Sequence, residues 1–288
     1  MRLARLMAIA AGIYCATCVP FVRKGDSVRV LVFNMHAGKD AAGNANIAEV
    51  GQIVRTSGAD VVLLQEVDRG TNRSGKVDQL QGLVEATGFR STFGQSLDYD
   101  GGQYGIAALS RGGFIYSETI PLPVKPIQER AGGSHEPRVA LLGVAIAPTG
   151  RLQTVNTHLD ASPTDAYRLQ EIAGILNVVR ARLSDVTPVL LGGDLNSEPD
   201  SAVVKRLRDA GLRDAWAECG RGDGLTYPAD RPVKRIDYVW LSGTLRCTAA
   251  EVLDTQASDH RPLLVTLARS PESTGAAPAP PAAQSPKD

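Results

Sequence analysis

The sequence predicts an α+β fold in one globular domain, because apolar runs of strand length alternate along the chain with segments of helical periodicity. The 288 residues, 43% of them hydrophobic, can supply one large core, and no repeat of solenoid period is present. Strands are expected over residues 28–33, 61–65, 105–110, 139–146, 152–156, 189–191, 238–241 and 263–267. Helices are expected over residues 46–56, 78–87, 165–183 and 201–210.

Two of the helices and one long connection have clear local signals. Ile47, Val50 and Val54 recur at helical spacing. Ser201 is a favoured N-cap and follows a proline turn, so a helix should begin there. Residues 120–137 contain four prolines and two consecutive glycines, which predicts a long loop that borders a substrate groove.

Polar groups able to bind metal or carry protons stand at the ends of six β-rich runs. These groups are Asn34, Glu66, His158, Asp194, Asp237 and the Ser258-Asp259-His260 triplet. An unpaired carboxylate is costly to bury at such a position, so the repeated pattern predicts one assembled site. Gly193 should let the backbone turn where the strand before Asp194 leaves the sheet. Taken alone, this segment is equally compatible with an ordinary strand-ending turn.

The order of these motifs resembles that of the endonuclease/exonuclease/phosphatase superfamily, which includes DNase I, abasic-site endonucleases, neutral sphingomyelinases and inositol polyphosphate phosphatases. The matching segments are Phe33-Asn34, Leu64-Gln65-Glu66, Thr157-His158-Leu159-Asp160, Gly193-Asp194-Leu195-Asn196, Ile236-Asp237-Tyr238 and Ser258-Asp259-His260. The resemblance implies a DNase I-like, four-layered α/β/β/α sandwich with its active site at one edge of two packed sheets. It also implies a divalent ion, usually magnesium (Mg²⁺), with manganese (Mn²⁺) as the alternative.

The expected metal ligands follow from the chemistry of phosphate-ester hydrolysis. A phosphodiester is negatively charged and repels hydroxide, so a hard cation held by oxygen ligands is the usual means of neutralising it. Glu66 is expected to be the direct ligand, and Asn34 and Asp259 to complete or orient the coordination sphere. Asp194 is expected to position and deprotonate the attacking water, and Asn196 to donate hydrogen bonds to a phosphoryl oxygen.

Two histidines receive catalytic roles from the resemblance. His260 resembles the family histidine that contacts the phosphoryl group, and Asp237 resembles the acid that orients it and favours its charged form. His158 resembles the second histidine of the DNase I and sphingomyelinase branches, which protonates or stabilises the leaving oxygen. No motif includes His36 or His135, so both are interpreted as ordinary surface or core residues.

Further residues are candidates for substrate contact. Tyr104 approximates the family tyrosine that points at the substrate phosphate, and Arg138 is expected to supply positive charge. Residues 73–75 are expected to form another substrate loop. For each of these, a solvated loop position is an equal alternative. Lys234 and Arg235 are interpreted as surface charge.

The predicted function is metal-dependent hydrolysis of a phosphate ester by water attack at phosphorus, with a phosphodiester preferred. The substrate, DNA, RNA or a phospholipid headgroup, is left open, and 31 basic against 31 acidic side chains provide no overall positive field for nucleic acid. A phosphomonoesterase and a catalytically silent binding module are the alternatives. The protein is expected to be a monomer.

The two ends of the chain differ from its middle. Residues 1–25, a short basic lead followed by an apolar run, predict a signal peptide or N-terminal anchor, with a globular helix as the alternative. Residues 26–269 are the predicted domain, and residues 270–288 a disordered tail rich in proline and alanine. The protein is therefore expected to be exported, periplasmic or secreted, or anchored with membrane contact at its N-terminus. In an oxidising compartment Cys219 and Cys247 would pair, and two unrelated buried thiols are the alternative.

Overall fold

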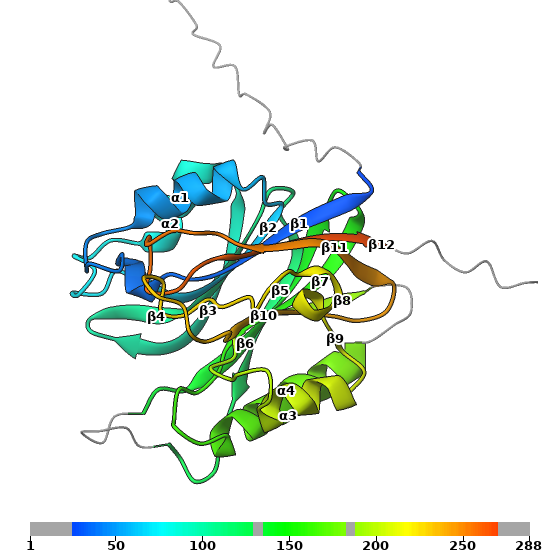
Figure 1. Ribbon diagram of the computed structural model, residues 1–288. Helices are drawn as coiled ribbons and strands as arrows, with labels where there is room; N and C mark the ends of the chain where they lie inside the picture. Colours follow the sequence, from blue (N-terminus) through cyan, green and yellow to red (C-terminus); the bar gives the residue numbers. More distant parts are fainter. Residues whose placement is uncertain (1–24, 129–134, 183–187, 270–288) are drawn as a thin grey trace, which may run out of the picture.

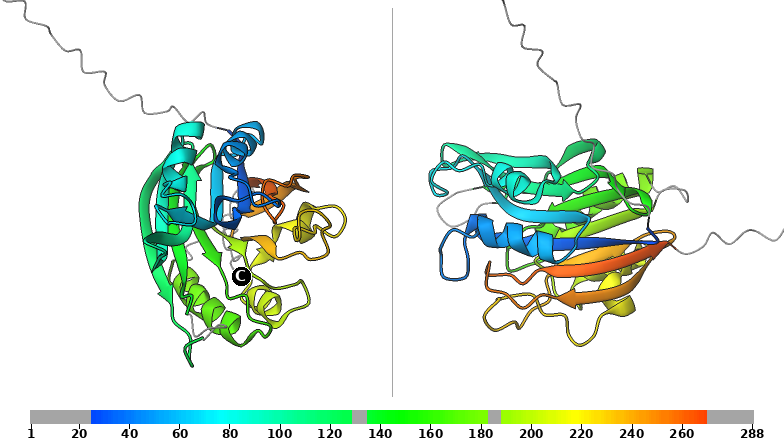
Figure 2. Two further views of the ribbon diagram at one scale, coloured as in Figure 1. Left: turned by 90° about the vertical axis from the view of Figure 1, so that its left-hand side faces the viewer. Right: turned by 90° about the horizontal axis from the view of Figure 1, so that it is seen from above.

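Two six-stranded sheets pack face to face and carry helices on their outer faces (Figure 1). The computed structural model describes residues 25–128, 135–182 and 188–269. These residues confirm the predicted four-layered sandwich, whose layers are seen edge-on in Figure 2. The predicted leader and the predicted disordered tail lie outside the described residues, apart from residue 25.

The first sheet has the strand order β11-β12-β1-β2-β4-β3. These strands are β1 (Ser27–Asn34), β2 (Val61–Arg69), β3 (Arg90–Tyr99), β4 (Gly102–Ser110), β11 (Leu245–Val252) and β12 (Leu263–Arg269). Helix α1 (Ile47–Thr56) is the crossover that allows β1 and β2 to run parallel. A short 3-10 helix η1 (His36–Gly38) follows β1, and helix α2 (Gln79–Thr87) follows β2.

The second sheet has the order β5-β6-β7-β8-β10-β9. These strands are β5 (Phe114–Leu122), β6 (Arg138–Ala147), β7 (Gly150–His158), β8 (Val189–Asp194), β9 (Arg213–Asp214) and β10 (Asp237–Leu241). Helix α3 (Ala166–Arg182) connects the parallel strands β7 and β8, and helix α4 (Ala202–Asp209) packs beside it. Helix α5 (Ala215–Cys219) lies next to β10 and β11.

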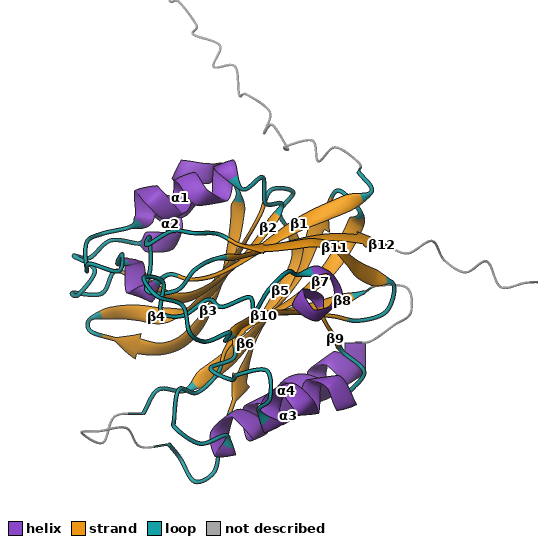
Figure 3. Cartoon of the chain, in the orientation of Figure 1, coloured by secondary structure: helices purple, strands orange, loops and turns teal. Residues whose placement is uncertain are grey.

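Alternation along each central strand builds three cores. In β1, Val30 and Val32 face the second sheet, whereas Leu31 and Phe33 face α1 and α2. Both faces of this strand are therefore buried, which is why it is apolar at every position from 30 to 33. A third cluster packs α3 and α4 onto the outer face of the second sheet (Figure 3).

The predicted helices and central strands are confirmed, and Ser201 caps α4 by accepting a hydrogen bond from the Val204 amide. Strands β3, β5 and β11 were not predicted, nor were the two-residue strand β9 and the short helix α5. Strands β3, β5 and β11 are edge strands with half-exposed faces, so they lack a strong apolar pattern. Residues 120–122, expected in the long loop, instead complete β5.

Strand β2 does not end before Glu66, as was expected, but continues to Arg69 through a β-bulge. The register with β4 shifts between Leu64 and Val67, and Glu66 adopts a left-handed φ of 55°. A bulge breaks the hydrogen-bond ladder and re-aims a side chain. Here it turns Glu66 toward the edge of the sandwich.

A buried amide of the second sheet closes this bulge. Asn156 Nδ2 donates to the carbonyl oxygens of Leu64 (2.9 Å) and Ala107 (2.8 Å), and its Oδ1 accepts from Gln65 Nε2 (2.7 Å). Neither amide side chain is exposed. Asn156 therefore satisfies backbone groups of the first sheet at the point where the bulge interrupts its ladder.

Cys219 and Cys247 form a disulfide with their Cα atoms 5.7 Å apart, which confirms pairing over unrelated thiols. Within residues 25–128, 135–182 and 188–269, no helix is both long and apolar enough to cross a membrane.

We expect Asn156→Ala to lower the free energy of unfolding by about 2–4 kcal/mol, because the buried Leu64 O, Ala107 O and Gln65 Nε2 each lose a hydrogen bond. Thermal and urea denaturation measure this loss. Thr154→Val, two residues away on the same strand, is the control, since Thr154 Oγ1 makes only a 3.4 Å contact with Gly143 O. Equal stability losses in the two variants would contradict the proposed bulge closure.

Candidate active site

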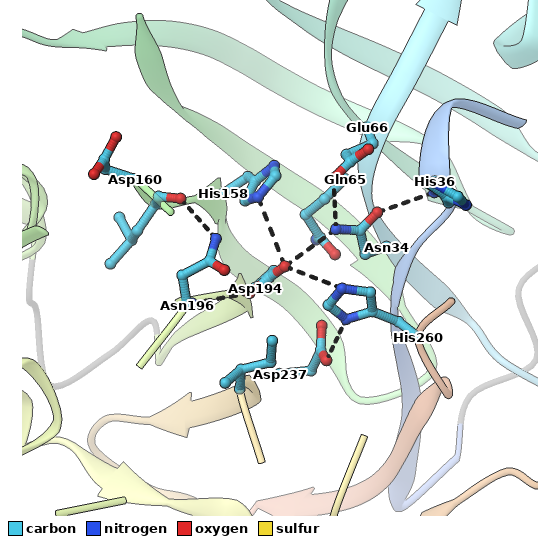
Figure 4. A network of polar contacts seen from close by, with 12 residues as sticks. Asn34, His36, Gln65, Glu66, His158, Asp160, Asp194, Asn196, Asp237 and His260 are labelled. Carbon is cyan, nitrogen blue, oxygen red and sulfur yellow. Dashed lines mark hydrogen bonds and ion pairs between the residues drawn. The ribbon is translucent and has the colours of Figure 1, made fainter. Parts of the chain in front are cut away.

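Asp194, the last residue of β8, is the centre of a buried polar network (Figure 4). Its Oδ2 lies 3.6 Å from His158 Nε2 and 3.6 Å from His260 Nε2, and accepts a hydrogen bond from Asn34 Nδ2 at 3.1 Å. Its Oδ1 accepts from the Asn196 backbone amide at 2.9 Å. Burial raises the pKa of the Asp194 carboxyl, and the charge on His260 opposes this rise.

The strand register explains why these groups meet. In the second sheet, Asp194 is directly opposite His158 on β7 and opposite Asp237 on β10. In the first sheet, Asn34 is opposite Gln65, one residue before Glu66. The ends of neighbouring strands therefore place their polar residues at one edge of the sandwich, as the sequence predicted.

Asn34 links the carboxylates of Glu66 and Asp194. Its Nδ2 lies 3.1 Å from Glu66 Oε1 as well as from Asp194 Oδ2, and its Oδ1 accepts from the His36 amide at 3.0 Å. Asn34 is buried, whereas Glu66 is partly exposed toward the cavity. Asn34 therefore holds the Glu66 carboxylate through a side-chain hydrogen bond.

His260 and Asp237 form a buried ion pair. His260 Nδ1 lies 2.9 Å from Asp237 Oδ2. Burial alone would lower the pKa of His260, but the carboxylates of Asp237 and Asp194 outweigh it and raise the pKa to about 10. His260 is therefore an imidazolium at neutral pH, with its Nε2 directed at Asp194.

Two further side chains, those of Asn196 and Ser258, are held in place by hydrogen bonds to backbone carbonyls. Asn196, with a left-handed φ of 47°, donates from Nδ2 to Leu159 O at 2.9 Å. Ser258 Oγ donates to Asn34 O at 2.7 Å and lies 3.2 Å from Asp259 Oδ1. The triplet 258–260 is thereby fixed against the end of β1.

A cavity of about 950 Å³ opens over this network. Among the residues named from the sequence, its lining includes Glu66, Tyr104, Arg138, His158, Asp194, Asn196, Asp259 and His260. Asn34 and Asp237 are buried beneath it, each only 1% exposed.

Several positions differ from their interpretation in the sequence. Arg235 is not surface charge: it is buried and pairs with Asp214 through contacts of 2.8 and 3.2 Å. His135 lines the cavity, and His36 Nδ1 lies 3.7 Å from Asp259 Oδ1, so both stand beside the site. Lys234, by contrast, is exposed, in agreement with its interpretation as surface charge, and it lies at the rim of the cavity.

Gly193 does not mark a turn, because β8 continues through Asp194. A Cβ built on Gly193 would lie 1.9 Å from Thr157 O, and its φ is 141°. A Cβ on the preceding Gly192 would lie 2.8 Å from Leu63 Cδ1 of the other sheet. The two glycines therefore permit close approach of the neighbouring strand and of the facing sheet.

Arg73 is positioned by a buried acid that was not predicted from the sequence. Asp68, which is fully buried, accepts from Arg73 Nε at 2.7 Å and from Nη2 at 2.8 Å. The guanidinium lies over the rings of Tyr99 and Tyr104 at the cavity wall. Asp68 lies beyond the predicted end of its strand, so only the observed extension of β2 reveals the pair.

Two sets of residues at this edge could hold a cation. The ligand atoms of Asp194, Asp237 and His260 lie within 4.8 Å of one another, as a metal site requires. Without a metal ion, the His260 imidazolium pairs with the Asp237 carboxylate and lies beside the Asp194 carboxylate. Glu66 and Asp259 offer further carboxylate oxygens at the cavity wall.

The residues match a known family over most of the chain. A model of the Endonuclease/Exonuclease/phosphatase family matches residues 31–260. The chain belongs to this family, whose members hydrolyse phosphate esters. No curated protein is similar enough in sequence to count as a match.

Solved structures confirm the fold. An endonuclease/exonuclease/phosphatase from Beutenbergia cavernae is 22% identical with a TM-score of 0.69, the match covering 85% of this chain and 72% of that one. A mannosyl-6-phosphatase from Bacteroides thetaiotaomicron is 18% identical, with a TM-score of 0.69 and coverage of 83% and 99%. The human Nocturnin catalytic domain with bound sulfate is 20% identical, with a TM-score of 0.67 and coverage of 86% and 96%.

We expect Asp237→Asn to lower the pKa of His260 toward or below its ordinary value, because burial then acts against less negative charge. In the unaltered protein, stability from this pairing is complete below pH 6.5 and is lost as the pH rises through about 10. NMR titration of the histidine rings in the presence of a chelator measures the change. Asp254→Asn, at an exposed acid paired with Arg261, is the control and should leave the His260 pKa unchanged.

Proposed function

We propose that this protein is a metal-dependent hydrolase that cleaves a phosphodiester by water attack at phosphorus. The observation that carries the proposal is the placement of Asp194 between two histidines, beside Asn34 and Glu66, at the floor of one cavity. Family membership supports hydrolysis of a phosphate ester. The sulfate bound by the Nocturnin domain, a mimic of phosphate, supports an anion site on this fold.

The residues around Glu66 fit a divalent cation. In the network around Asp194, the carboxyl groups of Glu66, Asp194, Asp237 and Asp259 outnumber the cationic His260. The nearby Arg138 and Arg73 are each paired with another acid, Glu136 and Asp68, so a bound cation would balance the remaining negative charge. Oxygen ligands of this kind suit Mg²⁺, with Mn²⁺ as the alternative. Glu66 would be the direct ligand, Asp259 a second carboxylate, and Asn34 the group that orients Glu66. When bound, the ion neutralises the phosphate charge.

The remaining steps belong to side chains of the protein. Asp194 is the proposed base: burial raises its pKa, and a carboxyl of raised pKa accepts a proton from water more readily. The His260 imidazolium, oriented by Asp237, meets negative charge that develops on the phosphoryl oxygens. Asn196, fixed by Leu159 O, retains a second amide hydrogen for the same group.

The substrate is proposed to be a phosphodiester of nucleic acid or of a phospholipid headgroup. Tyr104 and Arg73 form one wall of the cavity and are the proposed substrate contacts on that side. The mannosyl-6-phosphatase with the same fold makes a phosphomonoester the second candidate. A panel of plasmid DNA, RNA, sphingomyelin, phosphatidylinositol, a sugar phosphate and a nitrophenyl phosphodiester distinguishes these classes.

We expect Glu66→Gln to lower magnesium-dependent turnover by on the order of a hundredfold or more without unfolding the protein, because it removes a ligand charge and preserves shape. Activity measured against magnesium concentration, together with thermal melting, provides the test. Glu85→Gln on the outer helix α2 is the matched control. Unchanged activity of Glu66→Gln at ordinary magnesium levels would exclude Glu66 as a ligand.

We also propose that the protein is exported or anchored through its N-terminus. The basic and apolar residues 1–25 and the disulfide of Cys219 and Cys247 support this proposal. Mass spectrometry of protein from an exporting host, with and without reductant, should find the leader removed or membrane-associated and both thiols blocked until reduction. Soluble protein that retains Met1 and has two free thiols would contradict it.

A further inference from the structure

The two histidines that face Asp194 have partners of opposite charge. His260 presents Nδ1 to the Asp237 carboxylate at 2.9 Å, so Nδ1 carries a proton. His158 presents Nδ1 to Arg138 Nη1 at 3.1 Å. Both imidazoles direct Nε2 at Asp194 Oδ2 (Figure 4). The opposite partners imply different protonation patterns for the two rings.

A guanidinium can only donate hydrogen bonds. Arg138 is buried, and its Nη1 also contacts Glu136 Oε1 at 2.7 Å. Each of the two hydrogens on Nη1 therefore has an acceptor, one on His158 and one on Glu136. Burial opposes the charge of Arg138, but Glu136 and Tyr104 outweigh it and raise its pKa. Since Arg138 stays protonated, Nδ1 of His158 must accept, and an accepting ring nitrogen carries no proton.

We propose that Arg138 is a positioning residue that holds His158 in the tautomer with its proton on Nε2. His158 then acts as a neutral hydrogen-bond donor to the substrate and does not protonate the leaving oxygen. The catalytic role of His158 in this inference rests on the proposed function. The tautomer itself follows from the contacts of Arg138 alone.

The chemical consequence is a division of labour between the two histidines. A neutral imidazole N–H is a much weaker acid than an imidazolium, so it polarises an oxygen by hydrogen bonding rather than by giving up its proton. Asp194 takes a proton from the attacking water as the new P–O bond forms. The bond from phosphorus to the leaving oxygen breaks, and that oxygen takes a proton from solvent water. His158 keeps its proton throughout.

The tautomer can be observed directly. In the full chain labelled with ¹⁵N-histidine, long-range ¹H–¹⁵N spectra at pH 7 should show His158 with an unprotonated Nδ1 and a protonated Nε2. His158→Gln identifies its signals among those of the four histidines. A His158 imidazolium, or a ring with its proton on Nδ1, would overturn the proposal whatever the protein hydrolyses.

A matched pair of variants isolates the role of Arg138. Arg138→Gln keeps a hydrogen-bond donor without the charge, and Arg138→Met keeps the approximate length without a donor. Both variants lose the ion pair between Arg138 and Glu136, so a difference between the two variants cannot come from that loss. The Gln variant should retain the Nε2–H pattern of His158 and the Met variant should lose it. The same pattern in both folded variants would exclude Arg138 as the positioning residue, and the wild-type spectrum still decides the tautomer if the Met variant does not fold.

Leaving-group dependence tests the catalytic meaning. His158→Ala should lower turnover by about tenfold to a hundredfold on a nitrophenyl phosphodiester and by a similar factor on an alkyl phosphodiester, since a donor that keeps its proton serves both. A much larger loss on the alkyl ester, whose leaving group needs a proton, would refute the donor role. If neither ester is hydrolysed by the unaltered protein, the proposed function fails, whereas the spectra still decide the tautomer.

Discussion

The arrangement of the site depends on the contact between Asn156 and the interrupted ladder of β2. A β-bulge turns Glu66 toward the cavity, but it also interrupts the backbone hydrogen-bond ladder inside the protein. Asn156 supplies their hydrogen bonds from the opposite sheet and pairs with Gln65 at the same time. One buried amide thus joins the two sheets by hydrogen bonds at this point and satisfies the irregular backbone beside Glu66.

Charge at the site is arranged in layers around Asp194. Asp237 stands behind His260, and Arg138 stands behind His158, so each imidazole separates the central carboxylate from a second charged group. The first arrangement favours an imidazolium and the second favours a neutral ring. Two chemically identical side chains at equal distances from one carboxylate can therefore differ in charge because of the residue on their far side.

The sequence was sufficient to locate the site but not its internal geometry. Asn34, His158, Asp194 and Asp237 end or begin strands, and strand ends are recognisable because an apolar run stops at a polar group. Glu66 was selected from the sequence and lines the cavity, yet the bulge that aims it leaves no mark in the alternation, since both faces of β2 are buried.

Pairing between distant residues was harder still to foresee. The partnership of Arg235 with Asp214 joins positions that only β9 and β10 bring together, and a charged residue near a loop is usually solvated. Arg138 was expected to meet substrate directly, and its contact with His158 depends on the register of β6 and β7. The edge strands β3, β5 and β11 were missed for a related reason, because partners on one side only leave their sequences polar.

The first and last described residues of the domain leave it side by side. β1 pairs with β12 so that Ser27 is opposite Ala268, while Asn34 stands at the other end of β1, about 25 Å away at the usual rise per residue. An attachment made directly at these two strand ends, whether to a resin, a fusion partner or a membrane, would thus join the domain at the end opposite the site. The cavity would then face the surrounding medium rather than the surface to which the domain is attached.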